Sequence, residues 1–257
     1  MNLFALIFSF VFGTLIGSFL NVVSLRYNTG MGVGGRSKCF SCGKTLTWKE
    51  LIPLASFAMQ KGSCKKCKSK ISWQYPLVEF LSGILFVLVL FKFPPTGYVE
   101  AASTALYLFV TCLMLVITVY DMKHKIIPDP LVWTFDAVAV IAAIAFNWGH
   151  LASADFLWAI LAGPICAAPF ALIWVISKGK WMGLGDAKLI LGIGWLLGLS
   201  AAASAITLAF WIGAVISVLW MYSSFGKLRG HYEIPFAPYL ILGMYVVLLF
   251  NINVFAF

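Results

Sequence analysis

The sequence predicts an all-α protein that crosses a membrane about eight times, with its N-terminus outside and a small zinc-binding loop domain in the cytoplasm. Three observations support this fold class. Hydrophobic residues make up 62% of the 257 residues and charged residues only 11%, whereas about a quarter of a soluble chain is charged. The apolar residues gather in runs long enough to span a bilayer, and four cysteines stand together in the only extended polar stretch. This composition excludes a soluble globule, a disordered chain and a secreted disulfide scaffold.

Apolar runs predict the individual helices. The run 3–25 carries no charge and is closed by Arg26. About 23 helical residues, at 1.5 Å each, exceed a hydrocarbon core of about 30 Å. No Lys or Arg precedes this run, so we expect a permanent span and not a cleaved signal peptide. The other runs are 76–93, 101–120, 131–147, 156–177, 187–200, 202–222 and 237–256.

The run 187–200 is short for a span, because about 14 helical residues cover only about 21 Å. It contains Gly192, Gly194 and Gly198, and we expect neighbouring helices to pack closely around it and shield it. The chain is therefore predicted to have three parts. These are a first transmembrane helix (1–25), a cytoplasmic zinc-binding loop domain (26–75) and a bundle of about seven helices (76–257).

The basic residues predict the orientation in the membrane. The chain carries 18 Lys and Arg against 9 Asp and Glu, which gives a formal net charge of +9. Cytoplasmic segments of membrane proteins are enriched in Lys and Arg. With the N-terminus outside, every Lys and Arg except Lys92 falls in the cytoplasmic segments 26–75, 121–130, 178–188 and 223–236. The basic charge therefore reflects topology, and we expect no nucleic-acid partner.

Four cysteines in the polar stretch have the spacing of a zinc site. Cys39 and Cys42 form one C-x2-C pair, and Cys64 and Cys67 form a second pair after 21 intervening residues. Each pair bends two thiolates toward one ion, and Gly43 supplies a flexible turn. Four thiolates leave no open position on the ion, so the metal is expected to be structural. A redox-active pair is the lesser alternative.

Two further patterns are not assigned a function. Residues 30–35, GMGVGG, contain a literal G-x-G-x-x-G. This pattern follows an apolar helix instead of a strand, and Cys39 interrupts any helix that would begin after it, so we interpret it as accidental. Cys112 and Cys166 lie inside apolar runs, where they are expected to pack as small hydrophobic residues.

Two aspartates stand at the cytoplasmic ends of predicted spans. Asp121 ends the run 101–120, and Asp186 precedes the run 187–200 within the segment GLGD. Ionisable groups at this depth are costly, and a functional role is the default hypothesis. The alternatives are that Asp121 reaches the headgroups beside nearby lysines and that Asp186 is a helix N-cap. Asp129, followed by a proline, is expected to be such a cap.

Together the two carboxyls predict aspartic-protease chemistry. When two carboxyls share one proton, the ionised member takes a proton from water while the neutral member donates to the scissile carbonyl oxygen. The expected helix ends predict Asp121 as the acid and Asp186 as the base in the first step. Gly183 and Gly185 lack side chains, so an extended substrate backbone can approach Asp186; an ordinary turn explains them equally well.

These residues resemble the bacterial type IV prepilin peptidases, the GxGD-type membrane aspartic endopeptidases that process prepilins and type II secretion pseudopilins. The resemblance covers nearly the whole chain. It is carried by GSFLNVVSLR at 17–26, both cysteine pairs, LIPLAS at 51–56, ISWQYPLVE at 71–79, the stretch 121–129, GLGD at 183–186 and IPFAPYL at 234–240. Departures occur at Asn28, Phe40 and Ala237, and we expect none of them to touch the aspartate pair.

The resemblance implies that Asp121 and Asp186 are the catalytic pair. It implies a substrate with a short basic leader before an apolar helix, cut at the cytoplasmic face of the bacterial inner membrane. It also implies methylation of the new N-terminus, with S-adenosylmethionine as the methyl donor. Glu79 falls in a family motif, where orienting the substrate amine or the methyl donor is one interpretation; an ion pair with a loop lysine is the favoured one.

Functions from two other classes remain open from the residues alone. A proton-coupled transporter or channel also uses paired membrane carboxylates, although relay carboxylates are expected in the middle of the bilayer and these two lie at one surface. A membrane-anchored zinc interaction module would use the two aspartates only as caps. Lys188 has two equally supported interpretations, as a charge acting on Asp186 or as an anchor reaching the headgroups.

Overall fold

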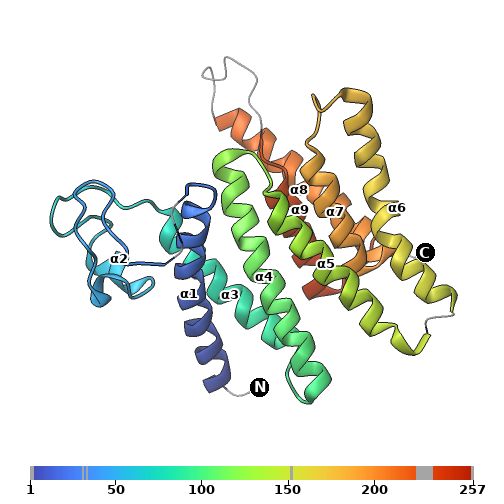
Figure 1. Ribbon diagram of the computed structural model, residues 1–257, viewed down its shortest axis with the longest axis horizontal. Coiled ribbons are helices and arrows are strands. Elements are labelled where there is room, and N and C mark those ends of the chain that lie inside the picture. Colours follow the sequence, from blue (N-terminus) through green and yellow to red (C-terminus); the bar gives the residue numbers. More distant parts are fainter. Residues whose placement is uncertain (1–2, 31, 33, 151–152, 224–233, 256–257) are drawn as a thin grey trace. The chain divides into compact units, whose positions relative to one another are not determined.

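The computed structural model describes residues 3–30, 32, 34–150, 153–223 and 234–255, and helices dominate this part of the chain (Figure 1). Each predicted apolar run forms a helix. These helices are α1 (Leu3–Arg26), α3 (Gln74–Lys92), α4 (Tyr98–His124), α5 (Asp129–Phe146), α6 (Ala154–Ser177), α7 (Leu184–Leu197), α8 (Leu199–Ser223) and α9 (Ala237–Phe250). The described residues contain no strand, only two isolated bridges in the polar segment. The all-α prediction is confirmed.

The helices α1, α3, α4, α5, α6 and α8 are long and apolar enough to cross a membrane. The other two are shorter: α7 and α9 have 14 residues each. At 1.5 Å per residue each extends about 21 Å, less than a hydrocarbon core of about 30 Å. A membrane protein is therefore confirmed, while eight crossings and an external N-terminus stay predictions. Most of the expected cytoplasmic segment 223–236 lies outside the described residues.

The chain divides into two compact units, Met1–Val119 and Tyr120–Phe257. In the first, α1 and α3 run antiparallel and pack closely (Figure 1). Glycines permit this approach, because a Cβ at Gly13 would lie 2.8 Å from the Ser82 carbonyl oxygen and a Cβ at Gly17 would lie 2.8 Å from the Ser82 Cβ. Asn21 is fully buried and donates to the Tyr75 carbonyl oxygen at 3.2 Å.

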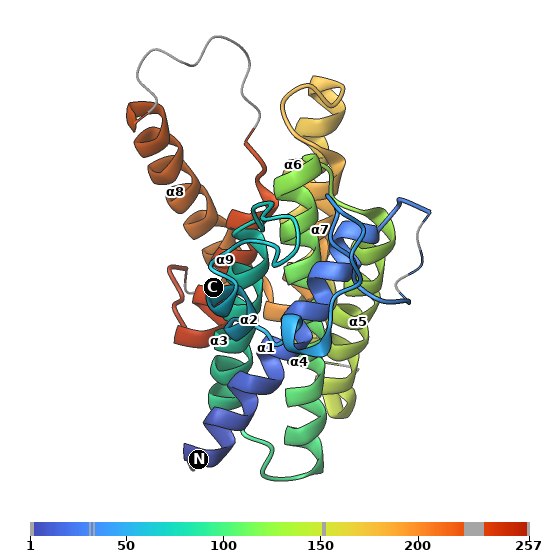
Figure 2. The same ribbon diagram turned by 90° about the vertical axis from the view of Figure 1, so that its left-hand side faces the viewer.

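The polar segment leaves α1 and returns to α3 at the same end of this helix pair (Figure 2). It contains two short helical elements, η1 (Trp48–Glu50) and α2 (Ala55–Met59). Within the described residues, no helix or strand follows directly after Gly35, and Arg26 donates to the carbonyl oxygens of Gly32 and Gly34. The glycine-rich pattern thus lacks the helix that a dinucleotide site needs. The predicted division at residues 25 and 75 stays a prediction.

In the second unit, α7 packs against α5, α6, α8 and α9. This central position shields the short helix α7 from lipid. The glycines in the run 187–200 predicted such close packing by neighbouring helices. A Cβ at Gly194 would lie 2.6 Å from the Gly163 Cα of α6, so only glycine allows this approach. Trp195 Nε1 donates to the Ile160 carbonyl oxygen at 2.8 Å and joins the same two helices. Packing against these neighbours therefore fixes the position of α7 and of Asp186, which lies in the first turn of this helix.

Candidate functional site

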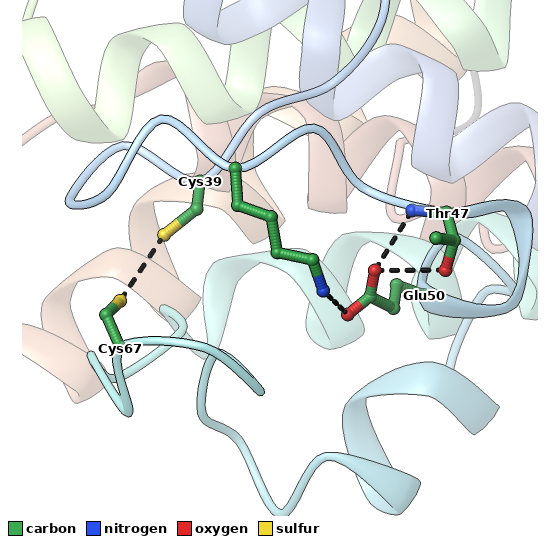
Figure 3. Close-up of polar contacts among 5 residues, drawn as sticks. Cys39, Thr47, Glu50 and Cys67 are labelled. Carbon is green, nitrogen blue, oxygen red and sulfur yellow. Dashed lines mark hydrogen bonds and ion pairs between the residues drawn. The ribbon is translucent and has the colours of Figure 1, made fainter.

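The four predicted zinc ligands lie together in the polar segment. The sulfur atoms of Cys39, Cys42, Cys64 and Cys67 all lie within 4.8 Å of one another. The sulfurs of Cys39 and Cys67 are 3.8 Å apart (Figure 3). A tetrahedral zinc ion with Zn–S bonds of about 2.3 Å places its ligands about 3.8 Å from each other. The donor set therefore fits a single four-coordinate ion.

The two cysteine pairs have the same local backbone structure. In the first, the Cys39 N–H donates to the Lys44 carbonyl oxygen and the Gly43 N–H donates to the Cys39 carbonyl oxygen, both at 2.9 Å. The second pair repeats both bonds at 2.9 Å, with the residues Cys64, Lys68 and Ser69. The fourth residue after each first cysteine has a positive φ, 67° at Gly43 and 59° at Lys68. The backbone thus orients two sulfurs in each turn.

Hydrogen bonds favour the thiolate form of two of the ligands. Backbone N–H groups of Cys42 and Ser41, in that order, are the main causes that lower the pKa of Cys39 to about 6. The Ser69 hydroxyl, followed by its backbone N–H, lowers the pKa of Cys67. Because the thiolate is the form that binds zinc, these donors prepare Cys39 and Cys67 for the metal, whereas desolvation and the neighbouring thiols raise the pKa of Cys42 to about 11.

Glu50 fixes the segment between the two cysteine pairs. Its Oε1 lies 2.7 Å from Lys44 Nζ, and its Oε2 accepts the backbone N–H and the hydroxyl of Thr47 at 3.0 Å each (Figure 3). The bond from Lys44, and then the bond from the Thr47 N–H, lower the pKa of Glu50 to about 2. Glu50 is buried, so its carboxylate is the centre of a polar network in a loop that has little apolar core.

Glu79 lies at the junction of the loop and α3, and only 7% of its surface is exposed. Its Oε2 accepts the backbone N–H of Leu54 at 2.8 Å, and the Ser18 side chain of α1 also hydrogen-bonds to it. Leu54 has a φ of 59°, a conformation that is uncommon for leucine. In the described part of the chain, Glu79 forms no ion pair with a loop lysine. Its partners are a main-chain N–H and a serine.

The two predicted catalytic aspartates come together in the second unit. Asp121 lies in the last turn of α4 and is 4% exposed, and Asp186 lies in the first turn of α7. The two carboxyls are close enough for the Asp121 charge to act on Asp186. Among the described residues, Asp121 Oδ2 is buried without a hydrogen-bond partner. A buried polar oxygen with no protein partner is available to a water or a substrate. Asp121 is thus enclosed by protein and not exposed at the end of α4.

Asp186 is not the N-cap of α7. Gly183 occupies the cap position, and Asp186 is the third helical residue. Its carboxylate accepts a hydrogen bond from the Gly183 backbone N–H. An acidic side chain at the third position commonly reaches back to the cap in this way. The bond orients the carboxylate and leaves acceptor capacity on its oxygens.

The start of α9 contributes a donor that the sequence analysis missed. Ala237, the first residue of α9, is fully buried and its backbone N–H hydrogen-bonds to Asp121. The first N–H groups of a helix have no partner inside the helix, and they favour negative charge nearby. The expectation that Ala237 stands away from the aspartate pair was therefore wrong. The only sequence signal for this region was the segment IPFAPYL, which is part of the family resemblance. That signal does not predict that a backbone N–H contacts the aspartate pair.

The two glycines beside Asp186 differ in their surroundings. A Cβ at Gly185 would lie 2.9 Å from the Ile127 Cβ, so glycine is required for packing there. A Cβ at Gly183 would have only Asp186 Oδ2, at 3.6 Å, and the Gly185 nitrogen as neighbours. Gly183 is exposed and leaves room beside the carboxylate. Substrate binding at either glycine stays a prediction.

Lys188 and Asp129 pair with each other. Lys188 Nζ lies 2.7 Å from Asp129 Oδ1 and 5.3 Å from the centre of the Trp133 ring. Neither expected interpretation of Lys188 names this partner. Asp129 is the first residue of α5 and not its cap, because Pro128 occupies the cap position and no side chain caps the helix. The prediction that Asp129 is a helix N-cap was wrong: its carboxylate forms an ion pair with Lys188 of α7.

Asp136 is a buried acid that the sequence analysis did not consider. It lies in α5 and is 3% exposed. Its signal was present in the sequence, since it is a lone charge within the apolar run 131–147. An ionisable residue at such a position is a candidate for function.

Comparisons with known proteins identify the family of the chain. Residues 11–93 match the model of the bacterial peptidase A24 N-terminal domain, and residues 108–218 match that of the type IV leader peptidase family. The first match includes the cysteines and the second includes Asp121 and Asp186. No solved structure shows a significant match.

Curated relatives match over almost the full length. A prepilin leader peptidase/N-methyltransferase of Bacillus subtilis is 30% identical over 250 residues, which cover 96% of this chain and 95% of that protein. A protein of the same name from Aeromonas salmonicida is 29% identical, covering 94% of this chain and 89% of the relative. A type 4 prepilin-like proteins leader peptide-processing enzyme of Escherichia coli is 29% identical, covering 90% and 88%. The chain belongs to the type IV leader peptidase family.

Proposed function

We propose that the chain is a membrane aspartic endopeptidase that removes the basic leader from type IV prepilins or pseudopilins. The observation that carries this proposal is the meeting of Asp121 and Asp186 in one unit, with a buried, unpartnered oxygen on Asp121. Two carboxyls in such contact share a proton more readily than they both ionise. The family and the names of the relatives support the same reaction.

The pair would act on a water held between the two carboxyls. The ionised carboxyl takes one proton from this water, and the oxygen bonds to the scissile carbonyl carbon while the neutral carboxyl donates its proton to the carbonyl oxygen. The resulting diol collapses, the C–N bond breaks, and the leaving amine receives a proton from the pair. Proton number is conserved over the cycle. The Gly183 and Ala237 N–H groups orient the two acids without taking part in the transfer.

The helix ends do not by themselves assign the acid and the base. Asp121 is at the C-terminal end of α4, which predicted it as the acid, but the N-terminal end of α9 also faces it. Asp186 lies at the N-terminal end of α7. Both carboxyls thus receive a backbone N–H that favours negative charge. We treat the pair as one titrating unit.

The substrate, the site of cleavage and the second activity extend the proposal. A cytoplasmic active site in the inner membrane is supported by the positions of the Lys and Arg residues. The four cysteines would hold a structural zinc ion, which would supply folding energy to the loop and no catalytic step. Methylation of the new N-terminus, with S-adenosylmethionine as donor, is supported by the relatives' names. Glu79 stays the predicted residue for orienting the amine or the donor.

Neither alternative function gains support. The matched family is a peptidase family, and the relatives named above are leader peptidases or leader peptide-processing enzymes. A zinc interaction module that uses the aspartates only as caps does not agree with the positions of Asp121 and Asp186, since neither is an N-cap.

One experiment tests both proposed activities. The purified full chain is incubated with a prepilin-like peptide and S-adenosylmethionine, and the products are read by mass. Wild type and Asp155→Asn, a control at an exposed acid of α6, are expected to yield the cleaved peptide and then a product heavier by one methyl group. Asp121→Asn and Asp186→Asn are expected to yield neither, because methylation needs the new N-terminus. Cleavage that survives in both variants would contradict the peptidase mechanism.

A further inference from the structure

The interface between α5 and α7 contains a carboxyl that the proposed reaction does not use. Asp136 is 3% exposed, and both of its oxygens are buried. In the described part of the chain no side chain hydrogen-bonds to them, and the backbone N–H of Gly192 is the main-chain donor near the carboxyl. One neutral donor does not offset the large desolvation cost of a buried ionised carboxylate. Such a residue needs either a cation or a proton of its own.

Gly192 makes the room for this carboxyl. A Cβ at position 192 of α7 would overlap Asp136 Oδ1 and the Phe135 ring. The Asp136 side chain therefore lies directly against the α7 backbone. Glycine is a poor helix former in the middle of a helix, so its presence here needs a packing reason, and the Asp136 carboxyl is that reason.

The neighbouring charges leave Asp136 without its own cation. Lys188 lies one turn before Gly192 and is close enough to act on Asp136, but its ammonium is bound to Asp129 at 2.7 Å. Asp129 and Asp136 are seven residues apart on α5, which places them on one helix face. The other ionisable groups on the helices packed here are Asp186 on α7, and Asp155 and Cys166 on α6; none of these adds a positive charge.

We propose that the Asp136 carboxyl is protonated and that its hydrogen bond joins α5 to α7. Asp136 is then a positioning residue for Asp186. Its hydroxyl donates to a backbone carbonyl oxygen of α7 near Gly192. Asp186 lies six residues before Gly192 on the same helix, so this contact sets the position of the catalytic carboxyl. Loss of the proton leaves an anion that competes with Asp129 for Lys188 and loosens the α5–α7 contact. Cleavage then falls reversibly as the pH rises.

The proton is tested without reference to activity. Infrared spectra of the full chain are recorded in a maltoside detergent, which has no carbonyl group, at neutral and alkaline pH. Because the aspartate pair is proposed to hold a proton as well, the spectra are compared in the Asp121→Asn, Asp186→Asn double variant, where the pair has no carboxyl. A band of a protonated carboxyl is expected there, and adding Asp136→Asn is expected to remove a component of it that otherwise disappears reversibly at alkaline pH, whereas adding Asp155→Asn is not. An identical band after adding Asp136→Asn would overturn the proposal.

The positioning role rests on the proposed peptidase function and is tested by its kinetics. Asp136→Asn keeps a neutral group that can donate a hydrogen bond, so we expect kcat within about twofold of wild type at neutral pH and an alkaline limb displaced to higher pH, where only the aspartate pair loses its proton. Asp136→Ala removes the donor, and a displaced Asp186 is expected to lower kcat about 100-fold with little change in KM. Equal kcat losses in Asn and Ala, or an alkaline limb unchanged in Asn, would overturn the role. A wild type that cleaves nothing would contradict the peptidase function, while the infrared result would still decide the proton.

Discussion

The Leu54 N–H donates to Glu79 Oε2 at 2.8 Å, and this bond joins the polar loop to α3. Leu54 holds a φ of 59°, so its backbone needs a partner that compensates for an unfavourable conformation. We predict that Glu79→Ala increases hydrogen exchange at residues 52–57 about tenfold or more, as loss of a bond to a charged group implies. Exchange measured by mass spectrometry on the full chain checks this.

The matched control for this prediction is Glu79→Gln, which keeps an oxygen that can accept the Leu54 N–H. It is expected to leave exchange in the loop close to that of wild type. If the loop is equally protected in the alanine variant, Glu79 does not anchor it, and the role predicted from the resemblance, orienting an amine or a methyl donor, becomes the better explanation of its burial.

The cysteine cluster predicts one zinc ion per chain. Because all four sulfurs converge on one position, replacing one cysteine in each pair should abolish tight binding. We expect metal analysis to give about one zinc in wild type and little in a Cys39→Ser, Cys64→Ser double variant. Cys112→Ser and Cys166→Ser together form the control, since both lie outside the cluster. An unchanged zinc content in the double variant would rule out this centre.

Glu50 should make loop stability depend on pH. Its folded pKa of about 2 lies below the unfolded value near 4.5, so its stabilising effect is complete above that unfolded value and is lost as the pH falls toward 2. We predict that Glu50→Gln raises the rate of hydrogen exchange in the loop relative to wild type at pH 7. The ratio of the variant's exchange rate to that of wild type should fall toward one as the pH is lowered from about 4.5 to 2. A ratio that is constant over this range would show that the Glu50 charge has no stabilising role.

Length and hydropathy were sufficient to predict where the helices lie, because a span must satisfy its backbone internally and bury an apolar surface over its whole length. The prediction is least accurate at the C-terminal end. The apolar run reaches residue 256, but α9 ends at Phe250, where Asn251 adopts a φ of 51°. Hydropathy does not detect this local stop, whereas an asparagine in the left-handed conformation ends a helix.

The candidate site was predictable where local spacing decides the geometry. The C-x2-C pairs and the GLGD segment each position their own side chains, so sequence distance is a good guide to them. The bond from Ala237 to Asp121 and the pair between Lys188 and Asp129 join segments distant in the sequence. Hydropathy has no information on such contacts, because they depend on how the helices pack.

Gly185 gives a last test of how α7 positions Asp186. A Cβ at Gly185 would lie 2.9 Å from the Ile127 Cβ, closer than packed side chains allow, so Gly185→Ala must displace the first turn of α7. A catalytic group displaced by about 1 Å can lose about 100-fold in rate, and we expect a fall in kcat of that order. Gly183→Ala is the matched variant: its new Cβ would lie 3.6 Å from Asp186 Oδ2, an ordinary contact, in space open to a substrate backbone. It should keep kcat and raise KM. Steady-state cleavage of a prepilin-like peptide separates the two effects, and a wild-type kcat in Gly185→Ala would show that α7 is not held by this contact.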